Sequence, residues 1–128
     1  MGFLSKKSML VSLLALSVAA CASMGTIPPT TPVALDCNGD AGSYPVATTI
    51  TFTMKAGSAC VLQKVDFTHD KHGNYTHFTK HPPGSGPNPP VVFDYTGPSQ
   101  LPGDGAYFYY ITKNTNSHDG GGGGGIIK

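Results

Sequence analysis

The sequence predicts an all-β fold, a small β-sandwich of about six to seven strands that follows an N-terminal signal helix. Three observations predict this fold class. Apolar side chains recur at every second position in several short runs, which is the period of a half-buried strand. Clusters of glycine, proline and asparagine separate these runs. After the N-terminal segment, no run shows the period of an amphipathic helix.

The N-terminal segment, residues 1–20, has the pattern of an export signal. Lys6 and Lys7 give it a positively charged start, and an uncharged run over residues 9–20 follows. That run is shorter than the ~20 helical residues that span a bilayer. We therefore expect residues 1–20 to be a signal peptide that is removed on export.

The end of this segment carries a more specific motif, Val18-Ala19-Ala20-Cys21. It resembles the lipobox of bacterial lipoproteins, in which small residues precede a cysteine that is lipidated and becomes the mature N-terminus. Val18 stands where leucine is commonest. The resemblance implies a lipid anchor on Cys21, the membrane as a partner, and a place in the bacterial cell envelope, with the outer membrane favoured, facing the periplasm or the cell surface. Ala20-Cys21-Ala22 also fits an ordinary cleavage site, which would release a soluble secreted β-domain instead.

Lipidation of Cys21 would leave two further cysteines, Cys37 and Cys60. An even pair in an exported chain is most simply a disulfide. Such a bridge would stabilise the domain by about 3 kcal/mol on the loop-entropy estimate. The alternative is that one of the two ligates copper or zinc together with nearby histidines.

Composition divides the remaining chain into three parts. Residues 21–35 carry the lipidated cysteine and several prolines but little charge, which predicts an extended tether. Residues 36–115 form the predicted β-sandwich domain. Residues 116–128 form a Gly-rich tail, predicted to be flexible because six consecutive glycines lose much backbone entropy on ordering. Ile126 and Ile127 leave open that the tail docks as a last edge strand.

Alternation places the first strands of the domain. Residues 49–54 alternate apolar side chains with threonines, and residues 60–68 show a second half-buried pattern. Residues 70–74 read as a turn because Gly73 can adopt a positive φ. We therefore expect residues 75–80 to return as the hairpin partner of residues 60–68.

A proline-rich loop separates the two halves of the domain. Residues 82–90 hold five prolines in nine positions, which excludes a central strand or a helix. Residues 91–95 alternate again and predict a strand. Residues 106–112 are apolar or aromatic on both faces, which predicts a central strand covered on both sides.

The stretch LPGDGAYFYYI, residues 101–111, resembles the F-strand region of immunoglobulin-like domains, where a tyrosine sits at a corner just after a turn. Tyr107 would be that tyrosine. Tyr109 stands where antibody domains have their disulfide cysteine, and the core tryptophan is absent. The resemblance implies an immunoglobulin-like sandwich and carries no function.

Composition also excludes several functions. All 8 basic residues are lysine and all 7 acidic residues are aspartate, with no arginine and no glutamate. Without arginine the chain lacks the bidentate fork that binds phosphate, so a nucleic-acid partner is not expected. Without glutamate it lacks the commonest carboxylate of glycosidases and metalloproteases. No nucleophile elbow is present, and no enzyme is predicted.

Four of the five histidines, His69, His72, His77 and His81, fall close together in the chain. Histidine is a common ligand of zinc, copper and nickel. If residues 75–81 form a strand, His77 and His81 lie about 13 Å apart, too far for one ion. Only His69 and His72 would then chelate locally, with Asp70. A specific Zn or Cu site, weak surface chelation and plain exposed histidines all stay open, and no cofactor is firmly predicted.

The function that the sequence favours is a non-enzymatic structural or interaction module at the cell envelope, with an envelope protein as partner. The alternative is a periplasmic or surface metal-binding protein that uses the His69 to His81 cluster. The tyrosines at 107, 109 and 110 fit an exposed aromatic platform for sugar or protein, but packing in the core and at the corner is favoured.

Overall fold

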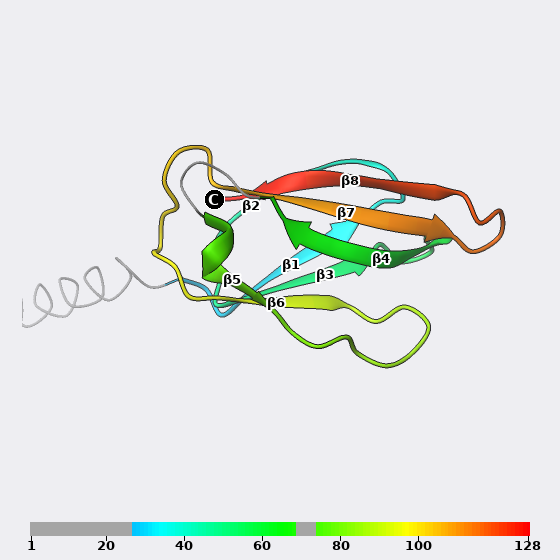
Figure 1. Cartoon of the computed structure of the whole chain (residues 1–128), viewed down its shortest axis with the longest axis horizontal. Helices are drawn as coiled ribbons and strands as arrows, with labels where there is room; N and C mark the ends of the chain where they lie inside the picture. Colours follow the sequence, from blue (N-terminus) through cyan, green and yellow to red (C-terminus); the bar gives the residue numbers. More distant parts are fainter. Residues whose placement is uncertain (1–26, 69–73) are drawn as a thin grey trace, which may run out of the picture.

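The computed structural model describes residues 27–68 and 74–128, and these residues fold as two mixed four-stranded β-sheets (Figure 1). The first sheet has the order β1-β3-β6-β5, with strands Thr30–Leu35, Thr49–Met54, Val91–Tyr95 and Phe78–Lys80. The second has the order β2-β8-β7-β4, with strands Gly39–Tyr44, Gly120–Ile127, Ala106–Asn114 and Cys60–Phe67. A short 3₁₀ helix, Asn74–His77, precedes β5. The predicted all-β class is confirmed.

The core lies between the two sheets and centres on Phe52 of β3, which is fully buried. Its ring meets Phe93 of the same sheet at a centroid distance of 5.9 Å and Phe108 of the opposite sheet at 4.9 Å. Both contacts are edge-to-face, the arrangement that aromatic quadrupoles favour. This aromatic cluster therefore joins the two layers.

The sequence predicted four strands correctly, three from the period of two and the fourth, residues 106–112, from its continuous apolar run. Residues 49–54 form β3, residues 91–95 form β6, and the predicted strands at 60–68 and 106–112 correspond to β4 and β7. In each of these strands, the buried side chains lie on one face of the strand, and that face packs against the other sheet. Alternation of apolar and polar residues predicts a strand when one of its faces is buried and the other is exposed to solvent.

The prediction of a tether up to residue 35 is wrong for residues 30–35, which form β1. Val33 and Leu35 are fully buried in the core, and β1 pairs with β3 in parallel. The two side chains alternate with exposed neighbours, so the strand pattern was present. Pro32 obscured it, because proline is accepted in a strand only at an edge, and β1 is an edge strand.

The prediction of a flexible Gly-rich tail is also wrong. Residues 120–127 form β8, which lies inside its sheet between β2 and β7 rather than at an edge. Backbone pairing on both sides and the fully buried Ile127 offset the entropy that the glycines lose. The strand count of the described residues is therefore eight, above the predicted six to seven.

The predicted hairpin between residues 60–68 and 75–80 does not form. β4 pairs with β7, whereas β5 pairs with β6 in the other sheet. Residues 74–77 form the 3₁₀ helix, and only residues 78–80 form a strand. The aromatic and threonine residues in this segment favour an extended backbone, but they do not determine which strand the segment pairs with.

One face of β7 is exposed, against the prediction of a strand covered on both sides. Tyr107 and Ile111 are each 40% exposed, whereas Phe108 and Tyr110 are buried between the sheets. Tyr110 donates from its hydroxyl to the carbonyl oxygen of Gly39 at 3.2 Å. The strand is therefore central within its sheet, but only one face packs on the core.

The predicted disulfide is confirmed, because Cys37 and Cys60 are bonded with their Cα atoms 5.7 Å apart. The bridge ties the β1–β2 turn to the start of β4. The predicted signal helix, residues 1–20, and Cys21 lie outside the described residues. Across residues 27–68 and 74–128, no helix is both long and apolar enough to cross a membrane.

Candidate functional site

The side of the structure where β4 and β5 form the sheet edges carries an apolar groove of about 200 Å³. It runs between β4 and the β5–β6 loop, residues 81–90, which is the proline-rich segment of the sequence. Most of its lining residues are apolar: Leu62, Val65, Pro82, Pro83, Pro89, Pro90 and Val91. We call this hollow the β4 groove.

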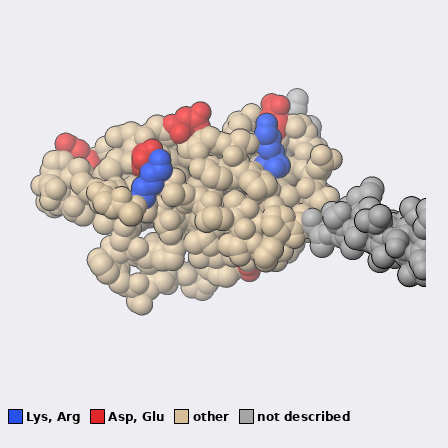
Figure 2. Space-filling view, turned by 180° about the vertical axis from the view of Figure 1, so that it is seen from behind, with Lys and Arg blue, Asp and Glu red and all other residues tan. Residues whose placement is uncertain are grey.

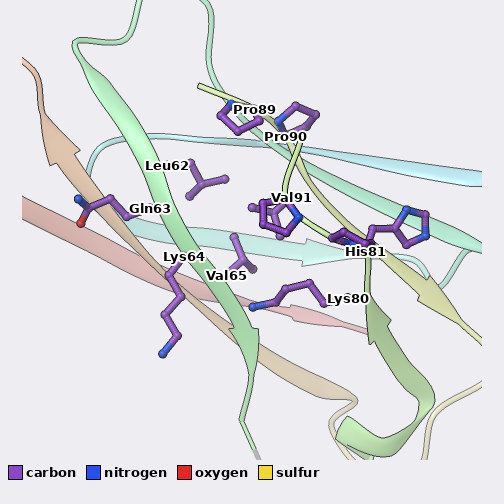
Figure 3. Close-up of a pocket in the computed structure, with 11 residues that line it drawn as sticks. Leu62, Gln63, Lys64, Val65, Lys80, His81, Pro89, Pro90 and Val91 are labelled. Atoms are coloured by element: carbon purple, nitrogen blue, oxygen red, sulfur yellow. The ribbon is translucent and has the colours of Figure 1, made fainter. Parts of the chain in front are cut away.

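Side-chain directions divide the residues of β4 between the groove and the outer face of the sheet. Leu62 and Val65 point toward Val91 across the groove, whereas Gln63 and Lys64 point away from it (Figure 3). The groove is therefore walled by aliphatic side chains and prolines, and the charged group of Lys64 lies outside.

The proline-rich loop is held in place against β4. The side-chain oxygen of Asn88 accepts a hydrogen bond from the backbone N–H of Leu62 at 3.1 Å. This bond satisfies one backbone group of the β4 edge and fixes the distance between loop and strand. The shape of the groove is therefore set by a hydrogen bond between the loop and β4.

Lys80 crosses the open side between the two sheets. Its ammonium lies 2.6 Å from one carboxylate oxygen of Asp66, and that of Lys64 lies 3.6 Å from the other. Two lysines therefore share one aspartate. On the face of the molecule in Figure 2, charged groups are few and the lysines lie beside acidic side chains.

A second hollow continues along the same side and has an aromatic floor. Its lining comprises Asp66, Phe67, Phe78, Lys80 and Phe93. Phe67 of β4 stacks on Phe78 of β5 with ring centroids 3.8 Å apart and nearly parallel planes. The stacked pair and the ion pair above it close the gap between the edge strands.

Contact with Tyr109, and then the charge of Asp66, hold the pKa of Lys64 above its ordinary value of 10.5. Lys64 also lies over the Tyr109 ring, 5.5 Å from its centroid. Tyr107, Tyr109 and Ile111 follow one another along the outer face of β7. Of the three candidate platform tyrosines, only Tyr110 packs in the core.

The histidines do not converge within the described residues. His81 pairs with Asp94 of β6, at 2.9 Å between Nε2 and Oδ2, and its ring is turned away from the groove (Figure 3). His77 ends the 3₁₀ helix and meets the Tyr95 ring edge-on. His69 and His72 lie outside the described residues. In the part of the chain that the structure describes, no three His, Cys, Asp or Glu side chains group as metal ligands.

A third hollow, which is polar, lies at the disulfide. There the Thr112 hydroxyl donates to the carbonyl oxygen of Cys37 at 2.8 Å, and the Asn38 side-chain oxygen accepts from the N–H of Gly122 at 3.2 Å. These bonds tie the β1–β2 turn to β7 and β8. The residues around this hollow therefore serve to lock the glycine-rich strand in place.

Sequence reasoning missed the β4 groove and the Lys80–Asp66 pair. It placed residues 60–68 and 75–80 side by side in one sheet, whereas they form facing edges of two sheets. The signal that was available was the loop of residues 82–90, because so many fixed prolines form a rigid wall.

Comparisons with protein-family models, curated proteins and solved structures found no match to this chain. Its function is therefore inferred from its own residues and their geometry.

Proposed function

We propose that this chain is an exported bacterial lipoprotein, anchored through Cys21, whose β-domain is a non-enzymatic interaction module at the cell envelope. The observation that carries the proposal is the pairing of the cysteines. The disulfide takes Cys37 and Cys60, which leaves the lipobox cysteine, Cys21, outside that bond. Cys21 follows small residues and an export signal, and this pattern resembles the lipobox, in which such a cysteine is lipidated.

The β4 groove supports the interaction role. Its volume of about 200 Å³ is below the roughly 300–1,000 Å³ of pockets that enclose small molecules. The groove is apolar and borders an edge strand, which is the arrangement used by domains that bind another polypeptide. A protein of the envelope is therefore the partner class that fits the groove.

For the architecture we propose an immunoglobulin-like core. The antiparallel orders β3-β6-β5 and β8-β7-β4 support it, since they match the B-E-D and G-F-C halves of such domains. β1 and β2 depart from that plan, because each pairs in parallel. The disulfide also joins different positions from the inter-sheet bridge of antibody domains.

Membrane fractionation tests the anchor. The full-length chain and its Cys21→Ser variant are expressed in a bacterial host, and membrane and soluble fractions are compared. Ser23→Ala, two residues further along, is the matched control. We expect the wild type and Ser23→Ala in the membrane fraction and Cys21→Ser outside it. A wild-type chain that fractionates as soluble, or a Cys21→Ser chain that stays membrane-bound, would reject the proposal.

A further inference from the structure

The two sheets end in four edge strands, and three of these are protected against pairing with another chain. β1 carries Pro32 at its middle, and β5 has only 3 residues. β2 has a register shift between Asp40 and Gly42. Prolines, shortness and bulges are the devices by which edges avoid association. β4, with 8 residues, is the longest edge; its own register shift lies between Leu62 and Lys64, and the stretch from Lys64 to Phe67 has no further shift.

The backbone of β4 faces outward at Val65 and Phe67. Thr68 donates its N–H to the carbonyl oxygen of Tyr107 at 2.8 Å, so Thr68 faces β7. Because alternate residues of an antiparallel strand direct their N–H and C=O to opposite sides, Val65 and Phe67 direct theirs to the open side. No strand of residues 27–68 and 74–128 pairs with β4 on that side.

The charges beside Val65 are self-complementary. Lys64 and Asp66 flank it, and their side chains are 47% and 33% exposed. Within the chain, Asp66 keeps Lys80 on one carboxylate oxygen at 2.6 Å, so Lys64 of a second copy would replace the looser contact of its own Lys64 at 3.6 Å. If a second copy of β4 runs antiparallel with the two Val65 residues opposite, each Lys64 lies opposite Asp66 of the other copy. Opposite charges at directly facing positions stabilise such a pair, and the twofold symmetry forms the contact twice.

We propose that β4 is a self-association edge, on which a second copy of this chain pairs antiparallel about Val65. Lys64 and Asp66 select the register. Moving the centre of the pairing by one residue, from Val65 to Asp66, places the two Asp66 side chains opposite each other, and like charges at facing positions destabilise a sheet. This partner is of the class expected for an interaction module, so the inference rests on the proposed function.

The proposed pairing involves few residues and joins two copies only. The Asn88 side chain already holds the N–H of Leu62, and the register shift between Leu62 and Lys64 interrupts the ladder. The edge thus stops the pairing at two copies rather than extending it, and association in solution is expected to be weak. A lipid anchor on Cys21 would confine the copies to one surface and raise their effective concentration.

Sedimentation equilibrium tests the proposal. The mature chain, extracted from membranes in a density-matched detergent, is compared with the charge-reversal variants Lys64→Asp and Asp66→Lys. We expect a monomer–dimer equilibrium for the wild type and a dimer at least about tenfold weaker for each variant alone, because each replaces two attractive pairs with two repulsive ones. An equal mixture of the two variants is expected to associate again, because their charges complement each other.

The control is Lys55→Asp, which reverses a lysine of the exposed Lys55–Asp36 pair just after β3. It is expected to dimerise like the wild type. Hydrogen exchange supplies a second readout, since the N–H of Val65 should become more protected as protein concentration rises. A wild type that stays monomeric, variants that dimerise like it, or a mixture that stays monomeric would overturn the proposal. Those results leave the Cys21 anchor standing, whereas an unlipidated Cys21 rejects the proposed function itself.

Discussion

Alanine in the glycine-rich strand β8 will destabilise the domain where the glycine is closely packed. A Cβ atom on Gly125 would lie 2.5 Å from Cζ of Phe108 and 2.7 Å from the carbonyl oxygen of Gly42. Phe108 is buried against Phe52, and Gly42 O belongs to the backbone of the neighbouring strand, so neither moves freely. Overpacking of this kind costs about 1–3 kcal/mol, so we expect Gly125→Ala to lower the free energy of unfolding by about 2 kcal/mol.

Gly120→Ala is the matched control, because a Cβ at Gly120 meets nothing within 4 Å. It is expected to be neutral or to stabilise by up to about 1 kcal/mol, since alanine restricts the unfolded chain. Urea unfolding measures both, and the loss in Gly125→Ala corresponds to a melting temperature about 10 °C lower in a domain of this size. Equal stability of the two variants would refute the placement of β8 inside the sheet.

Three further predictions concern the core, the disulfide and pH. Leu35→Ala should lower the free energy of unfolding by about 2–5 kcal/mol in a urea titration, because Leu35 is fully buried. A loss of only a few tenths of a kcal/mol would contradict the placement of residues 30–35 in the core and favour an extended tether. Removing the Cys37–Cys60 bridge with a reductant should lower it by about 3 kcal/mol, and an unchanged urea midpoint would contradict this. Burial raises the pKa of Tyr95 and Tyr110 above the ordinary 10.0, so the unfolded chain releases these protons first. Stability should therefore be complete below about pH 10 and fall as pH rises beyond it, and a free energy of unfolding that is flat across that range would argue against buried phenols.

Alternation identified the strands whose two faces differ in burial. In β3 and β6, apolar and polar residues alternate because one face meets the core and the other meets water. The disulfide followed from cysteine parity. These features depend on local sequence, which is why they were predictable.

Local sequence did not predict which strands pair with one another, and it did not predict that the glycine-rich residues 120–127 form a strand. Six glycines carry no hydrophobic period, and the order of β8 comes from backbone pairing with β2 and β7, which lie far away in sequence. The β4 groove was missed for the same reason. It exists only because β4 and β5 belong to different sheets, and local patterns do not specify which strands pair.

The most direct test of the account is the intact mass of the protein extracted from native membranes, measured with and without reductant. We predict the mass of a chain that begins at Cys21 with an attached diacylglyceryl or triacyl group, and a gain of two hydrogens on reduction of Cys37–Cys60. An unlipidated chain that begins at Ser23 would contradict the central claim, because the protein would then be secreted in soluble form.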